Sequence, residues 1–231
     1  MGVLIRGDLL SDDTDVVHGL SRLGPGGRPL DLGTGVDAAS WSWIARELGL
    51  PGAPVARLHQ IHGDAVAAVA TGGDAGQADA LWTEVPGLLL AVRVADCVPV
   101  VVAGEGRVCA IHAGWRGVAA GVVPAALAAM GGGKRAVVGP CISVGHYEVG
   151  EEVVEGITAA GVPETCFVDR ERGPRPHVDL RAAVAWQLEA NGVARVEVLP
   201  HCTFSDPLLP SYRRDGPRSW RMAGLIGLLP R

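Results

Sequence analysis

Apolar residues in the middle of the chain form three short, nearly uninterrupted runs. These runs are LLLAVRVAD (residues 88–96), VPVVVAG (98–104) and RVCAIHAG (107–114). Short runs rich in β-branched residues and bounded by glycine or aspartate are typical of buried strands. Asp96-Cys97 separates the first two runs, and Gly104-Glu105-Gly106 predicts a tight hairpin between the second and the third.

Patterns elsewhere predict helices that flank these strands. We expect helices over residues 37–52, 115–130, 151–161 and 179–192. Asp37 or Ser40 should lie near the start of the first helix, Pro124 should kink the second, and Asn191-Gly192 should end the last.

Further strands and loops fill the rest of the chain. Strands are expected over residues 135–140 and 195–200, and residues 54–66 should be extended with a turn at His62-Gly63-Asp64. Residues 19–35 are predicted as loop with short extended pieces, residues 71–79 as a polar loop, and the tail from His201 as loop before a final short apolar segment.

Strands that cluster and mix with helices without strict alternation favour an α+β fold, with mixed β-sheets flanked by helices. No repeat, low-complexity tract or linker divides the sequence, so we expect a single domain over residues 1–231.

Composition narrows the class of protein. The 231 residues are 48% hydrophobic and 19% charged, and the net charge of −5 argues against nucleic acid or an acidic membrane as partner. No apolar run approaches the roughly 18 residues that span a bilayer, and the N-terminus lacks the pattern of a signal peptide. The five cysteines are odd in number, scattered and without a CxxC pair, which does not suit a secreted disulfide scaffold. We therefore expect a cytoplasmic protein, whose oligomeric state the sequence leaves unknown.

Three residues at predicted turns and strand ends carry the candidate chemistry. His62 stands before a glycine turn, Cys97 lies between two strands, and His112 ends the third apolar run. On a regular strand Cys109 and His112 face opposite sides, so Cys97 across the hairpin is the better partner for His112. Two imidazoles and one thiolate suit zinc, and three protein ligands leave a fourth position open, as in catalytic sites. The alternative for each residue alone is structural: a loop histidine, or a cysteine that acts as a small apolar side chain.

Several segments resemble those of one known family. They are LHQIHGDAV, ADALWTEVPGLLLAVRVADCVPV, AIHAGWRG, VVGPCISVGHYEVGEEV and SYRRDGPRSWRMA. They closely resemble the laccase-domain family, also called multicopper polyphenol oxidase, whose members are described as zinc-dependent purine nucleoside phosphorylases. The resemblance runs from about residue 18 to the C-terminus. It implies a single α+β domain with mixed sheets, similar to the cysteine hydrolase fold of cytotoxic necrotizing factor. The chain departs from the family pattern in GLSRLGPGG and in RRDGPRSWR.

The resemblance also implies an activity and its site. By position, His62, Cys97 and His112 match the metal ligands of the family, for zinc or, alternatively, copper. The implied reaction is the cleavage of adenosine, inosine and methylthioadenosine by phosphate, and some members are described as deaminating adenosine. The small-molecule partners are then a purine nucleoside and phosphate.

Other residues near these motifs are candidates for substrate contacts. Arg116 lies four residues after His112, at the start of the helix expected over residues 115–130. It is the first candidate for phosphate, because guanidinium groups bind oxyanions in a bidentate manner. Asp96 is a candidate for orienting a metal ligand. The remaining candidates for contact with substrate are Gln60, Cys141 and Arg213.

Three other functions stay open. The spacing of Cys97 and His112 in the sequence also resembles that of metal-independent thiol hydrolases, in which the cysteine is the nucleophile and the histidine its base. A copper-dependent polyphenol oxidase needs clustered histidines, whereas the seven histidines here are scattered. A role in editing peptidoglycan precursors would require a cleft that binds cell-wall fragments without nucleoside turnover.

Overall fold

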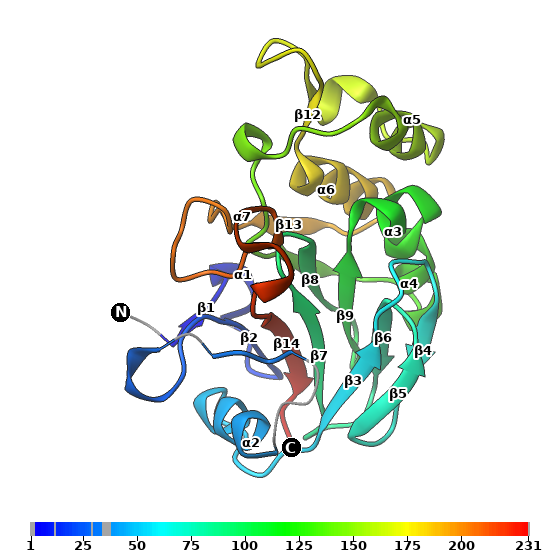
Figure 1. Ribbon diagram of the computed structural model, residues 1–231. Coiled ribbons are helices and arrows are strands. Elements are labelled where there is room, and N and C mark those ends of the chain that lie inside the picture. Colours follow the sequence, from blue (N-terminus) through cyan, green and yellow to red (C-terminus); the bar gives the residue numbers. More distant parts are fainter. Residues whose placement is uncertain (1–2, 12, 29, 34–37, 231) are drawn as a thin grey trace.

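Two six-stranded β-sheets form the centre of the protein (Figure 1). The computed structural model describes residues 3–11, 13–28, 30–33 and 38–230. The first sheet has the order β1 (Leu4–Ile5), β2 (Val16–Ser21), β14 (Met222–Leu228), β7 (Leu89–Val94), β3 (Val55–His59) and β5 (Gly73–Gln77). The second has the order β13 (Arg195–Val198), β10 (Arg135–Val138), β8 (Val98–Ala103), β9 (Val108–Ala113), β6 (Ala80–Thr83) and β4 (Val66–Ala68).

Both sheets are mixed. In the first, β3 runs parallel to β5 and β7, whereas β14 pairs antiparallel with β2 and β7. In the second, β10 runs parallel to β13 and antiparallel to β8. The predicted α+β class with mixed sheets is therefore confirmed.

Helices cover the outer faces of both sheets. The helices are α1 (Asp8–Ser11), α2 (Ala38–Glu47), α3 (Trp115–Ala120), α4 (Val122–Met130), α5 (Glu151–Ala159), α6 (Leu180–Ala190) and α7 (Tyr212–Asp215). Short 3-10 turns occupy Pro25–Gly27, Val144–His146, Glu164–Cys166 and Gly216–Arg218, and β11 (Val168–Asp169) pairs with β12 (His177–Val178). Helix α2 covers the first sheet, and α3 to α6 lie on the side of the second.

Three apolar clusters hold these layers together. Leu90, Val101 and Ile226 belong to the cluster between the two sheets. A second cluster packs α3 to α6 against the second sheet, and a third packs α2 against the first sheet. The second cluster is the larger, because four helices cover the second sheet. Apolar burial on both faces explains why the central strands are almost uninterrupted runs of valine, leucine and isoleucine.

The crossing between the sheets positions the candidate site. Strand β7 ends at Val94 in the first sheet, and β8 begins at Val98 in the second, so the intervening turn passes from one sheet to the other. The predicted hairpin of β8 and β9 is confirmed, with Pro99 opposite His112. This register brings the turn that carries Cys97 next to the end of β9.

Two predicted elements are wrong in detail. Residues 115–130 form two helices, and the break lies at Gly121 (φ 88°) and not at Pro124. Pro124 lies in the first turn of α4, where a missing N–H costs no helical hydrogen bond. Residues 73–77, predicted within a loop, form the edge strand β5, which pairs with β3 despite having no apolar alternation.

The other predictions agree more closely with the structure. The helices expected over 151–161 and 179–192 are α5 and α6, and the final apolar segment is the central strand β14. The tail also contains α7, which was predicted as loop. Helix α2 begins at Ala38, and Asp37 lies outside the described residues. Within the described part of the chain, every helix is too short or too polar to cross a bilayer.

Candidate metal centre

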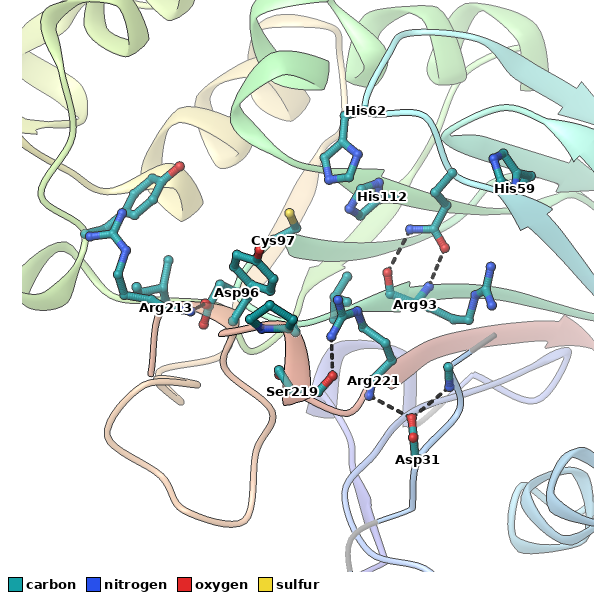
Figure 2. A pocket seen from close by; sticks show the side chains of 18 residues that line it. Asp31, His59, His62, Arg93, Asp96, Cys97, His112, Arg213, Ser219 and Arg221 are labelled. Atoms are coloured by element: carbon teal, nitrogen blue, oxygen red, sulfur yellow. Dashed lines mark hydrogen bonds between the residues drawn. The ribbon is translucent and has the colours of Figure 1, made fainter. Parts of the chain in front are cut away.

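Three side chains from different parts of the sequence converge at the end of β9. One ligand atom each of His62, Cys97 and His112 lies within 4.8 Å of the other two. The two imidazole rings meet edge to face, with centroids 4.8 Å apart and an interplanar angle of 83° (Figure 2). Two nitrogen donors and one sulfur donor at this separation suit a zinc ion, which takes such ligands at about 2.0–2.3 Å.

A buried carboxylate fixes both histidines. Asp79 is fully buried, and its Oδ1 lies 2.7 Å from Nδ1 of His112. The same carboxylate accepts hydrogen bonds from the backbone N–H groups of Ile61 (3.2 Å), His62 (3.0 Å) and Gly63 (2.7 Å). Because a carboxylate accepts, Nδ1 of His112 carries the proton, and Nε2 is left to bind a ligand.

His62 has an unusual backbone conformation. Its φ of 61° lies in the left-handed region, which residues other than glycine rarely adopt. The hydrogen bonds to Asp79 hold this turn in place and offset its strain, which is on the order of 1 kcal/mol or more. Such strain is typical of residues whose side chain must point in a functional direction.

Gly114 allows the three candidate ligands to lie close together. A Cβ atom at this position would stand 3.1 Å from both Sγ of Cys97 and Cδ2 of His62. Contacts this short would displace one of the two side chains. Glycine at position 114 therefore lets Cys97 and His62 keep these positions.

The ionisation of the site follows from the same contacts. Burial alone would raise the pKa of Cys97, but the charge and hydrogen bonds of His112 and His62 lower it. Burial alone would lower the pKa of His112, but Cys97 and Asp79 raise it. Cys109, in the middle of β9, has no such neighbour, and burial raises its pKa far above the ordinary value. The two thiols thus differ: the surroundings of Cys97 favour its thiolate, and those of Cys109 favour the neutral thiol.

A cavity of about 630 Å³ opens beside the three residues. Its lining includes the aromatic and apolar residues Ile142, Tyr147, Tyr212 and Pro217. It also includes polar and cationic residues, among them Gln60, Arg93 and Arg221. In Figure 2, Arg213 lies on one side of the cavity, and Arg93 and Arg221 lie on the other.

Two of the candidate substrate contacts line the cavity but already have partners. The side chain of Gln60 donates from Nε2 to the carbonyl of Arg93 (2.7 Å) and accepts from its N–H (2.8 Å). Arg213 donates to the carbonyl of Glu148 (3.0 Å), and its guanidinium lies 5.3 Å from the ring centre of Tyr147. Gln60 therefore holds the backbone of Arg93, and Arg213 braces an aromatic wall.

The other two candidates lie outside the cavity wall. Arg116 is exposed, and its guanidinium stacks on the ring of Trp115 at 4.4 Å. Cys141 is fully buried, and its neighbour Ile142 lines the cavity in its place.

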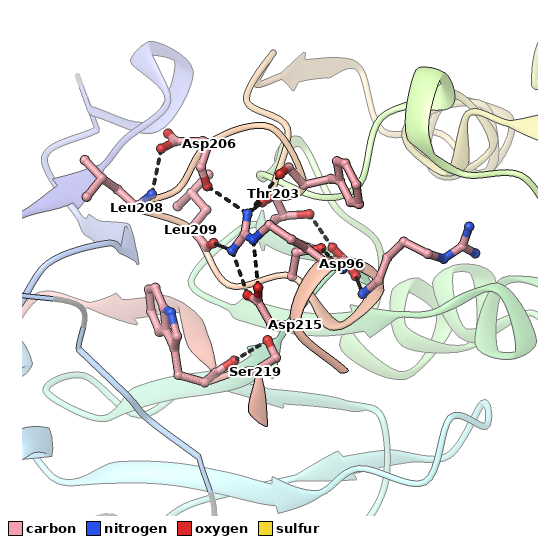
Figure 3. Close-up of polar contacts among 12 residues, drawn as sticks. Asp96, Thr203, Asp206, Leu208, Leu209, Asp215 and Ser219 are labelled. Carbon is pink, nitrogen blue, oxygen red and sulfur yellow. Dashed lines mark hydrogen bonds and ion pairs between the residues drawn. The ribbon is translucent and has the colours of Figure 1, made fainter. Parts of the chain in front are cut away.

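Asp96 does not contact the imidazoles in the way that the sequence suggested. Its carboxylate accepts hydrogen bonds from Oγ1 of Thr203 (2.6 Å) and from the N–H of Arg213 (2.6 Å), as Figure 3 shows. It thereby ties the turn that carries Cys97 to the C-terminal segment. Next to it, the guanidinium of Arg214 binds backbone carbonyls of the same segment, including that of Thr203 (2.9 Å), which is a structural role.

Sequence reasoning missed Asp79 and Arg93. A lone carboxylate directly before the apolar strand β6 is the signal for Asp79, because a buried acid requires partners. A lone arginine inside the apolar run of β7 is the corresponding signal for Arg93.

Comparison with known proteins identifies the family. A sequence model described as multi-copper polyphenol oxidoreductase laccase matches residues 35–229. The chain belongs to this family. A relative from Mycobacterium tuberculosis, named purine nucleoside phosphorylase, is 40% identical over 201 residues, which cover 82% of this chain and 78% of that protein. A relative of the same name from Deinococcus radiodurans is 39% identical over 194 residues, covering 80% and 74%.

Solved structures of the family show the same fold. A Neisseria meningitidis protein assigned to family DUF152 superposes with a TM-score of 0.82 and 32% identity, covering 99% of this chain and 100% of that one. The protein YlmD from Geobacillus stearothermophilus gives a TM-score of 0.85 at 25% identity, with 100% of both chains covered. The predicted family is confirmed, and the likeness to the cytotoxic necrotizing factor fold stays a prediction.

Proposed function

We propose that the protein is a zinc-dependent purine nucleoside phosphorylase that acts on adenosine, inosine and methylthioadenosine. The observation that carries the proposal is the convergence of His62, Cys97 and His112 beside a cavity, with Asp79 fixing both histidines. The name shared by the Mycobacterium and Deinococcus relatives supports the reaction class. We place the reaction in the cytoplasm, since free, scattered cysteines suit a reducing compartment.

The chain's own residues supply binding and orientation. The cavity of about 630 Å³ lies within the range of small-molecule sites. Tyr147, which lines the cavity and is partly exposed, offers the flat, apolar surface that a purine needs. A zinc ion held by the three ligands would supply Lewis-acid chemistry to the bound substrate. Asp79 keeps the proton of His112 on Nδ1, so that the ring presents a lone pair to the site.

Deamination of adenosine by the same centre is part of the proposal. It is separable from phosphorolysis, because deamination yields inosine without any need for phosphate. We assign zinc and not a multicopper centre, because His62, Cys97 and His112 are the only cluster of three such ligands in the described chain. Copper at this one site remains the alternative to zinc for the assay below.

A metal-independent thiol hydrolase is the second candidate, and one observation favours it. Asp79, His112 and Cys97 stand in the order of acid, imidazole and thiol, which is the arrangement of a cysteine hydrolase triad. A peptidoglycan-precursor editing enzyme would be a member of this class. The strained position of His62 favours the three-ligand centre, because a triad has no need for that residue.

The deciding experiment combines elemental analysis of freshly purified protein with a phosphate-dependent assay on adenosine and inosine. We expect about one zinc per chain, release of free base that requires phosphate, and loss of both after chelation. The variant His62→Ala should lose zinc and turnover together. Activity that survives chelation and the His62→Ala change would support the thiol hydrolase and refute the proposal.

A further inference from the structure

Three arginines gather on the outer face of the first sheet, at one end of the cavity. Arg93 on β7 and Arg221 just before β14 line the cavity, and both are half-buried. Arg57 on β3 is near enough to act on Arg93 electrostatically but does not line the cavity, and its guanidinium lies 5.2 Å from the ring centre of Trp41. The pairing of Arg93 with Ala223, and of β3 with β7, explains how residues so far apart in sequence share this end of the sheet.

Acidic residues lie near this group without pairing with its guanidinium groups. Among the described residues, none of the three arginines forms an ion pair with a carboxylate. Asp31, which also lines the cavity, accepts hydrogen bonds from the N–H groups of Gly33 (2.9 Å) and Arg221 (3.0 Å). Both hydrogen bonds go to Oδ1 of Asp31, and they come from the backbone and not from the guanidinium of Arg221.

The arginines act on one another electrostatically. Burial and the charges of Arg57 and Arg221 lower the pKa of Arg93, while Asp74 acts in the opposite direction. Half-buried guanidinium groups that repel one another are costly unless an anion joins them. The structure keeps this arrangement by holding the backbone of Arg93 with Gln60, through two hydrogen bonds.

Both cavity arginines keep free donors. Arg93 donates from one terminal nitrogen to the carbonyl of Leu58 (2.9 Å). Arg221 donates from a single nitrogen, Nη1, to the carbonyls of Ser219 (2.6 Å) and Trp220 (3.1 Å). Each guanidinium carries five N–H groups in a fixed fork, so each retains donors beyond these backbone bonds.

We propose that Arg93 and Arg221 form the oxyanion subsite of the cavity and bind inorganic phosphate there. The inference rests on the proposed phosphorolysis for its identification of phosphate as the co-substrate. It assigns the part of the cavity near Arg213, whose guanidinium lies against the ring of Tyr147, to the purine, so the two reactants would approach the metal centre from different sides. Arg116, the candidate from sequence, has no part in this subsite.

The test uses the zinc-loaded enzyme and three matched variants. Arg93→Gln and Arg221→Gln each remove one cavity charge, and Arg116→Gln removes an exposed charge outside the cavity. Calorimetry measures the binding of inorganic phosphate without nucleoside, with sulfate as an unreactive oxyanion of the same shape. Steady-state kinetics then gives KM for phosphate and, separately, KM for inosine.

We expect each cavity variant to weaken phosphate binding and raise KM for phosphate about 10-fold or more, the usual effect of losing charge-assisted hydrogen bonds. KM for inosine should change less than about 3-fold, and Arg116→Gln should behave as the parent enzyme. If Arg221→Gln fails to fold, Arg221→Lys replaces it; lysine keeps the charge but loses the fork, so an intermediate KM for phosphate is expected.

The remaining outcomes separate the two proposals. Unchanged phosphate affinity in both cavity variants, or a loss confined to Arg116→Gln, would overturn the subsite even if phosphorolysis is observed. Arginine-dependent binding of phosphate and sulfate by a protein that cleaves no nucleoside would leave the subsite standing and overturn the proposed function.

Discussion

Two histidines of equal burial lie in the two sheets and have opposite properties. His18 on β2 and His112 on β9 are each 2% exposed. Burial, together with the charge of Arg6, lowers the pKa of His18 to about 4, and its Nε2 accepts a hydrogen bond from the N–H of Gly7 at 3.0 Å. His18 is thus a neutral acceptor inside the fold.

His112 differs because anionic groups face both of its nitrogens. Asp79 lies at Nδ1, and Cys97 lies on the side of the candidate metal centre. These neighbours raise the pKa of His112 although burial alone would lower it. The comparison shows that depth of burial does not distinguish a structural histidine from a ligand, whereas a paired carboxylate does.

The largest expected effect comes from removing the thiol beside His112. Cys97→Ala leaves two nitrogen ligands, so we expect loss of bound zinc and loss of turnover by at least about 1,000-fold, because a catalytic zinc needs three protein ligands. Cys109→Ala is the control, since Cys109 is buried in the middle of β9 and faces the helices. It should keep its zinc, and equal loss from both variants would show that the wrong thiol was assigned. Metal content by mass spectrometry and nucleoside cleavage measure the two effects.

The second effect tests the neutral state of His18. Its pKa is about 4 in the folded protein and 6.5 in the unfolded chain, so between these values the unfolded chain binds more protons. The free energy of unfolding should therefore fall as the pH drops from 6.5 to 4, by about 3 kcal/mol from this group. Urea unfolding of the parent protein and of His18→Gln at several pH values measures it. The variant should lack this part of the pH dependence; parallel curves would contradict the assignment.

The sequence was sufficient to predict that Cys97 lies next to His112, because the two residues flank one local hairpin. Two apolar runs with a short glycine turn between them predict a hairpin, and the register follows from the turn. The break between β7 and β8 was visible in the sequence, although not its passage between two sheets.

The role of Asp79 depends on contacts between distant segments. It lies 17 residues from His62 and 33 from His112. The pairing of β6 with β9 brings it to His112, and the pairing of β6 with β4 brings it to the turn at His62. Sequence alone favoured Asp96 over Asp79 for orienting a metal ligand, because Asp96 is the neighbour of Cys97 in the sequence. Long-range pairing likewise decides that Arg93 lines the cavity while Arg116 does not.

The third effect tests the carboxylate that distinguishes His112 from His18. Asp79→Asn keeps the size of the side chain but removes its charge, and an amide cannot accept every hydrogen bond that the carboxylate accepts. We expect zinc affinity to fall about 10- to 100-fold, the usual result of losing the partner of a metal-bound histidine. Competition with a chelator of known affinity measures the change.

Asp96→Asn is the matched control for this substitution. It alters the tie to Thr203 and Arg213 but leaves both imidazoles untouched. Its zinc affinity should stay within about 3-fold of the parent value. A larger loss in Asp96→Asn than in Asp79→Asn would restore the role that the sequence suggested for Asp96.

The smallest effect concerns a cysteine–histidine pair that has no carboxylate. Sγ of Cys202 lies 3.7 Å from Nδ1 of His146 and accepts hydrogen bonds from Oγ (3.1 Å) and N–H (3.4 Å) of Ser143. Burial alone would raise the pKa of Cys202, but the donors of Ser143 and Ser205 lower it to about 6.

Alkylation by iodoacetamide, followed residue by residue with mass spectrometry, should therefore reach half of its maximal rate near pH 6 at Cys202. The exposed Cys166 serves as the internal control, and Cys202→Ser should keep zinc content and turnover within about 2-fold. Loss of zinc in Cys202→Ser would show that this cysteine–histidine pair influences the metal centre although it lacks a carboxylate. It would contradict the conclusion that a paired carboxylate distinguishes a ligand histidine from a structural one.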